Sequence, residues 1–182
     1  MLMLVVIAAA ELISMACTSG KNDAATLWAG TGDGAHQVAS GTVADMMAKG
    51  SAQAGFELKL PGYIPEGSHV GNIDLGGGAA DNPNTHGAVA VIHIQGSHGS
   101  YYLAEFKGVF ETPKGMSWEP APGLGSAGET VYSIPNRLQL SRGHGPTAYA
   151  IVGLHRSYTI EADADDSEAV DLPKMVESLV AD

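Results

Sequence analysis

The sequence predicts an α+β domain in which a single antiparallel β-sheet carries an N-terminal and a C-terminal helix packed on one face. The 182-residue chain contains 24 glycines and 9 prolines, which favours many short turns and therefore strands. Several segments alternate apolar and polar residues, as half-buried strands do. Residues 42–55 and 171–180 instead repeat apolar residues at intervals of three and four, as amphipathic helices do. The length suits one domain with a substantial core.

The first helix is predicted at residues 42–55. Thr42 is a suitable N-cap, Asp45 follows three residues later, and Gly55 is placed to end the helix. Its apolar stripe consists of Val43, Met46, Met47 and Ala54. Because Gly50 lowers helix stability by about 1 kcal/mol relative to Ala, this helix should depend on docking.

The next segment is predicted to be a strand that ends in a stiff corner. Phe56, Leu58 and Leu60 alternate with charged residues, which indicates one apolar face. Pro61-Gly62 favours a type II turn, and residues 64–67 (Ile-Pro-Glu-Gly) favour a second turn. The corner is architectural, since it contains no convincing catalytic group.

Seven further strands are predicted. Residues 69–75 form one, and residues 87–95 and 101–107 form a β-hairpin with a short glycine-containing connection. Residues 112–128 are rich in Pro and Gly and should form a long excursion. The remaining strands are expected at residues 130–134, 137–141 and 147–154, with residues 157–162 pairing beside the last of them.

The final helix has clear starting signals. Asp171 is the predicted N-cap, and Pro173 lies in the first turn, where its missing N–H costs nothing. Its apolar stripe consists of Leu172, Met175, Val176, Leu179 and Val180. This stripe should pack on the sheet.

The N-terminal residues indicate export. Residues 1–16 are almost all apolar, yet they are too short to span a bilayer, which needs roughly 20 residues. Small Ala16 precedes Cys17, the only cysteine, and this arrangement resembles a bacterial lipoprotein signal. The resemblance implies that Cys17 is lipidated and anchors the chain to a membrane. We expect residues 1–17 to be the signal segment, residues 18–41 a flexible linker, and residues 42–182 a single extracytoplasmic domain.

Charge and cysteine content exclude several classes. The 20 acidic and 9 basic residues give a net charge of −11, which repels nucleic acid. A lone cysteine allows neither an internal disulfide nor a cysteine-based zinc site. Residues 30–34 (Gly-Thr-Gly-Asp-Gly) lack the following Gly-Lys-Ser/Thr of a phosphate loop, and no cofactor is predicted.

No catalytic or metal site emerges from the motifs. The seven histidines include no closely spaced ligand pair, and His93 with His98 is the pair to test for metal binding. No serine has the Gly-x-Ser-x-Gly context of a hydrolase nucleophile. We therefore expect a non-enzyme, with a metal-dependent extracytoplasmic hydrolase as the alternative.

Aromatic residues of the hairpin and the long excursion define a candidate ligand cleft. Aromatic-lined concavities with a few polar groups are typical ligand sites. The candidate residues are Tyr101, Tyr102, Trp118, Tyr132, His93 and His98. The alternative is that the aromatic rings cap the ends of a small core.

The order of elements and the motif Pro61-x-Tyr63-x-Pro65-Glu66-Gly67 resemble an uncharacterised bacterial extracytoplasmic domain family. Its signature is Pro-x-Tyr-Leu-Pro-Glu-Gly, and its members occur in lipoproteins and anti-sigma-factor-like membrane proteins. Here Ile64 replaces Leu. The resemblance implies a cell-envelope location and a binding or sensing role, with an envelope protein or a small ligand as partner and no catalytic residue. A lipid or lipoprotein carrier is the other alternative.

Overall fold

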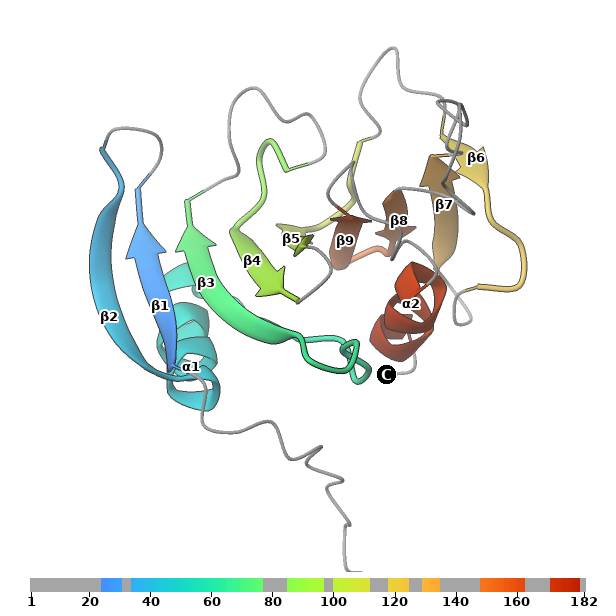
Figure 1. Cartoon of the computed structure of the whole chain (residues 1–182). Coiled ribbons are helices and arrows are strands. Elements are labelled where there is room, and N and C mark those ends of the chain that lie inside the picture. Colours follow the sequence, from blue (N-terminus) through green and yellow to red (C-terminus); the bar gives the residue numbers. More distant parts are fainter. Residues whose placement is uncertain are drawn as a thin grey trace, which may run out of the picture.

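A computed structural model describes residues 24–30, 34–76, 85–96, 100–111, 118–124, 129–134, 148–162 and 171–180. These residues form one nine-stranded sheet and two helices (Figure 1). The spatial order of the strands is β2-β1-β3-β4-β5-β9-β8-β7-β6. Their bounds are β1 Ala24–Ala29, β2 His36–Thr42, β3 His69–Leu75, β4 Ala90–Gln95, β5 Ser100–Lys107, β6 Glu119–Pro120, β7 Thr130–Ile134, β8 Ala148–Val152 and β9 Arg156–Ala162. The helices are α1, Val43–Ala54, and α2, Leu172–Val180.

The predicted single antiparallel sheet is wrong, because the sheet is mixed and the described chain is mostly β. Strands β1 and β3 pair in parallel, with Leu27 beside Ile73, whereas the other neighbouring strands are antiparallel. A parallel pair needs a long crossover, usually one that contains a helix. Here the crossover consists of β2, α1 and the segment after α1, which bring the chain back to the side of β1 that β2 leaves open, where β3 pairs.

Residues 18–41 were predicted to be a flexible linker, and this is wrong where the two strands β1 and β2 form. Strand β1 lies inside this range, and β2 begins inside it and ends at Thr42. Ala25 and Leu27 are fully buried in the core and alternate with Thr26 and Trp28. This short alternation is a strand signal, but the small alanines weaken it. The strand β2 is mostly exposed and lies at the edge of the sheet.

The two faces of the sheet differ in what covers them. Both helices pack on one face, which we call the helix face, and both contribute to the main core, as the sequence predicts. Helix α1 lies against β1, β2 and β3, and α2 lies against β8 and β9 (Figure 1). The opposite face, called the helix-free face, carries a smaller apolar cluster around Phe106 and Phe110.

Residues 56–67, which we call the strap, connect α1 to β3 along the helix face. The predicted strand at residues 56–60 is wrong, since these residues join no ladder. Their apolar side chains nevertheless pack on the main core, as the alternation indicated. Two backbone N–H groups of the strap donate to side chains instead of to a neighbouring strand. Leu58 N donates to Ser51 Oγ at 2.9 Å, and Lys59 N donates to Glu105 Oε1 at 2.7 Å.

The corner within the strap also differs from prediction. Gly62 has no positive φ, so it is not the third residue of a type II turn. The second turn lies one residue later than expected, because Ser68 N donates to Pro65 O at 3.0 Å and Gly67 has φ 78°. A glycine is favoured at such a φ.

Most other predicted elements are confirmed. The Thr42 side chain accepts a hydrogen bond from Asp45 N, and α1 ends at left-handed Gly55 with φ 60°. Strands β4 and β5 form the predicted hairpin, and β8 pairs with β9. The predicted strand at 137–141 lies outside the described residues. Within the predicted excursion, β6 pairs with β7.

Candidate functional site

The residues of the predicted aromatic cleft do not all share one side of the sheet. Tyr101 is buried in the main core on the helix face. Tyr102, Trp118 and Tyr132 instead pack against the apolar cluster on the helix-free face. The predicted site is therefore wrong for Tyr101, since consecutive strand residues point to opposite faces. His98 and Cys17 lie outside the described residues.

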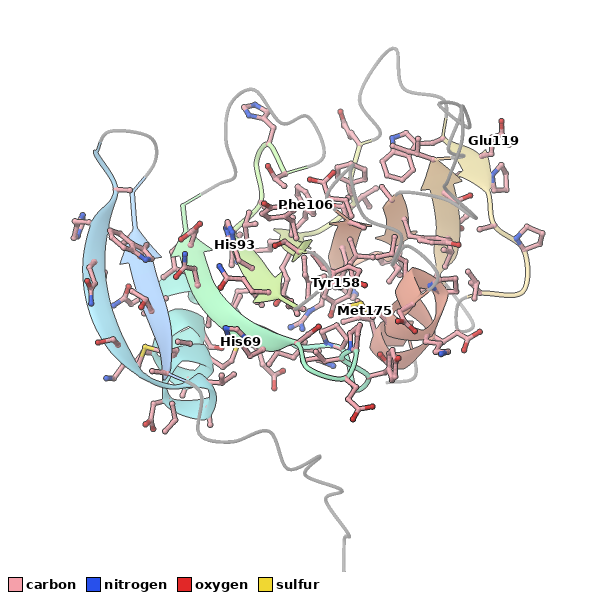
Figure 2. The ribbon with its side chains drawn as sticks, viewed as in Figure 1. His69, His93, Phe106, Glu119, Tyr158 and Met175 are labelled. Carbon is pink, nitrogen blue, oxygen red and sulfur yellow. The ribbon has the colours of Figure 1, made fainter. Side chains whose placement is uncertain are left out.

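His93 lies on the helix-free face, where its side chain contacts Asp74 and Tyr102. Its Nε2 is 2.7 Å from Asp74 Oδ2, and both side chains are about one-third exposed, at 27% and 35%. The His93 and Tyr102 rings meet edge to face, with centroids 5.0 Å apart. Figure 2 labels His93 and Phe106 on the side away from α2, Tyr158 on the side facing α2, and Met175 on α2 itself.

The strand register extends this group across four strands. Trp28 on β1 is beside Asp74 on β3, and Asn72 on β3 is beside His93 on β4. His93 in turn is opposite Tyr102 on β5. All five side chains are half-buried. We call Trp28, Asn72, Asp74, His93 and Tyr102 the polar–aromatic group.

A second aromatic group lies farther along the same face. The rings of Phe110 and Trp118 meet edge to face with centroids 6.1 Å apart. Trp118 Nε1 is buried and has no hydrogen-bond partner among the described residues. The buried Ser157 hydroxyl holds the segment before this group, donating to Gly108 O at 2.7 Å and accepting from Phe110 N at 3.0 Å.

The predicted metal pair, His93 with His98, is untested because His98 is not described. Among the described residues, no group of three or more His, Cys, Asp or Glu side chains could hold a metal ion. No described helix is long and apolar enough to cross a membrane.

The helix face holds a buried carboxyl group that sequence analysis missed. Glu105 on β5 is 0% exposed and is directly opposite Tyr158 on β9. Its Oε1 accepts the hydrogen bond from Lys59 N of the strap. Its Oε2 is buried and has no hydrogen-bond partner among the described groups.

Burial raises the pKa of Glu105 to about 7, which the Lys59 amide and the Arg156 guanidinium oppose only in part. Arg156 Nη1 is 3.8 Å from Glu105 Oε2 and donates instead to Tyr158 OH at 3.1 Å. The Arg156 guanidinium carbon also lies 4.3 Å from the centroid of the Phe56 ring. Glu105 is therefore an incompletely compensated acid beneath the strap.

A signal for Glu105 is present in the sequence. Within β5, Tyr101, Leu103 and Glu105 alternate onto one face, and the first two are buried in the main core. A carboxylate at the third such position is out of place unless it has a partner or a function.

Comparison of the chain with protein-family models, with curated proteins and with solved structures gives no match. The resemblance of the proline corner to an extracytoplasmic domain family remains a prediction.

Proposed function

We propose that this protein is a non-enzymatic binding module outside the cytoplasmic membrane, anchored by a lipid on Cys17, and that its ligand binds the helix-free face at the polar–aromatic group. The observation that carries the proposal is the Asp74–His93–Tyr102 arrangement, in which a histidine contacts a carboxylate at 2.7 Å and an aromatic ring edge to face, while the histidine and the carboxylate stay partly exposed.

The chemistry of this group suits a ligand with both polar groups and apolar surface. Trp28 and Tyr102 offer aromatic surface on β1 and β5. Together, Asp74, His93 and Asn72 on β3 and β4 offer hydrogen-bond donors and acceptors. Aromatic surface with a few polar groups that fix orientation is typical of ligand sites.

The net charge narrows the ligand class. A charge of −11 disfavours polyanions over the whole surface. We therefore propose a neutral or basic ligand rather than a nucleic acid or an acidic polymer.

Tryptophan fluorescence can test this site directly. The chain has two tryptophans, so Trp118→Phe leaves Trp28 as the only one. We expect a neutral oligosaccharide or a lysine-rich peptide to change the Trp28 emission saturably. His93→Ala and Tyr102→Ala should each weaken that binding at least about tenfold, the effect of losing roughly 1.4 kcal/mol.

A matched control is His155→Ala, which removes an exposed histidine from the turn between β8 and β9. Its affinity should equal that of the parent protein. The proposal would be contradicted if neither probe gave a saturable change, or if His93→Ala and Tyr102→Ala bound as tightly as His155→Ala.

A further inference from the structure

The strap is attached to the rest of the helix face at a few points along its length. Near its start, the Phe56 ring lies under the Arg156 guanidinium, and Leu58 N is bonded to Ser51 of α1. Toward its end, Tyr63 OH donates to Asp171 Oδ1 at the start of α2, at 2.9 Å. Between these points, Lys59 N is bonded to Glu105 of β5.

The middle attachment differs from the others because its acceptor is a titratable group with no exposed surface. A carboxylate can accept about four hydrogen bonds. Under the strap, Glu105 receives one at Oε1 and none at Oε2 from described groups. Lifting the strap would let water reach both oxygens.

We propose that the strap is a proton-controlled element, docked on the sheet while Glu105 is neutral and released more often when Glu105 is ionised. The inference goes beyond the proposed function, since it does not depend on what the helix-free face binds. It gives the fold a conformational response to pH, in which release uncovers Phe56, Leu58 and the centre of β5.

The direction follows from solvation. A buried carboxylate loses much of its hydration energy, whereas a neutral carboxyl group loses far less. The pKa of Glu105 is about 7 when docked, against the ordinary value of 4.5 that a hydrated glutamate would have. Ionisation therefore favours the hydrated, released form, and the release equilibrium should rise as pH rises from 5 to 8.

The charges that face Glu105 do not reverse this direction. Arg156 on β9 and the Lys59 side chain on the strap attract the carboxylate, and Glu57 on the strap repels it. On β4, the residue opposite Glu105 is the uncharged Ala90. On β9, burial raises the pKa of Tyr158, and the carboxylates of Glu105 and Glu129 both contribute to this rise. Burial outweighs the combined attraction of Arg156, the Lys59 amide and the Lys59 side-chain charge.

Amide hydrogen exchange of the intact protein measures release at the Lys59 N–H. After correction for intrinsic exchange rates, we expect its protection to fall about 70-fold between pH 5 and pH 8, as the two pKa values require. Glu105→Gln keeps an oxygen acceptor for Lys59 but cannot ionise. Its Lys59 protection should change less than about threefold over the same range.

Two further variants keep the test specific. Glu129→Gln removes another acid from the same neighbourhood and should retain the pH dependence of the parent. Tyr63→Phe removes the attachment to Asp171 and should lower protection by a similar factor at both pH values. The proposal is overturned if Glu105→Gln keeps the full pH dependence, or if parent Lys59 protection is flat. It is equally overturned if Lys59 is as strongly protected as the β4 and β9 amides at each pH, because Lys59 would then exchange only when the whole domain opens.

Discussion

Glu105 shows how one side chain can make the stability of a fold depend on pH. It occupies a core position on β5, yet it carries an ionisable group whose only described hydrogen bond comes from the strap. Replacing such a group by an uncharged residue of similar shape often leaves stability unchanged or raises it. The acid therefore costs stability near neutral pH.

The free energy of unfolding should accordingly fall as pH rises. The folded-state pKa is raised to about 7 from 4.5, so the stabilisation is fully present below 4.5 and is lost as pH rises through 7. Between pH 5 and pH 8 we expect a loss of about 2–3 kcal/mol from this group. Urea unfolding at both pH values measures it. Glu105→Gln should be more stable than the parent at pH 8, and Glu129→Gln should not. An equal pH slope in the parent and in Glu105→Gln would contradict the assignment.

At the scale of elements, α1 and the strap are fitted to each other at Gly50. A Cβ on Gly50 would lie 2.9 Å from Leu58 Cδ1 and 3.5 Å from Leu27 Cδ1. Glycine in a helix costs about 1 kcal/mol relative to alanine. Here that cost allows the strap to approach the helix, because both leucines are buried in the core.

A double-mutant cycle tests this fit. Gly50→Ala gains about 1 kcal/mol of helix propensity but overpacks the core, which typically costs 1–3 kcal/mol. We expect it to lower the free energy of unfolding by about 1 kcal/mol. In a Leu58→Ala background the space is free, and the same change should raise stability by about 1 kcal/mol. Chemical denaturation of the four proteins gives the coupling, and additive effects would show that Gly50 and Leu58 do not compete for space.

The elements that sequence analysis identified are those with large alternating side chains or clear caps. Strands β3, β4, β5, β7, β8 and β9 and both helices belong to this group. Strand β1 was missed because Ala25 contributes little apolar contrast. Its parallel pairing with β3 was out of reach, since alternation shows which face a residue occupies but not the direction of its neighbour.

The candidate sites were predictable to different degrees. Tyr102, Trp118 and Tyr132 pack against one apolar cluster, and their role in a ligand cleft stays a prediction. The alternation of strand residues alone places Tyr101 on the opposite face from Tyr102. Asp74 as the partner of His93 depends on the β3–β4 register. The contact between Lys59 and Glu105 joins residues 46 positions apart, so only the folded chain reveals it.

At the scale of the whole molecule, the two edges of the sheet are unlike. The described edge strand β6 has two residues, one of them Pro120, whereas β2 has seven residues with no proline and no Lys, Arg, Asp or Glu. Short edges and proline discourage pairing with other chains. The N-terminal end of the sheet is therefore the less protected one, and it is also the end from which the proposed anchor leads.

The anchor itself can be tested by fractionation. Cys17→Ser removes the thiol that a lipid would modify, and one myristoyl-sized chain already gives measurable membrane binding. We expect the parent protein in the membrane fraction and the variant in the soluble extracytoplasmic fraction. Retention of Cys17→Ser on membranes in the same amount as the parent would contradict lipidation at this residue.

The position of β1 between β2 and β3 has a mechanical consequence. A pulling force that enters the domain through its N-terminal side would act along β1. It would load the hydrogen bonds to β2 and those to β3 together, in shear, instead of peeling them apart one by one. A strand held on both sides in this way resists tension better than an edge strand does, which would suit the proposed attachment through Cys17.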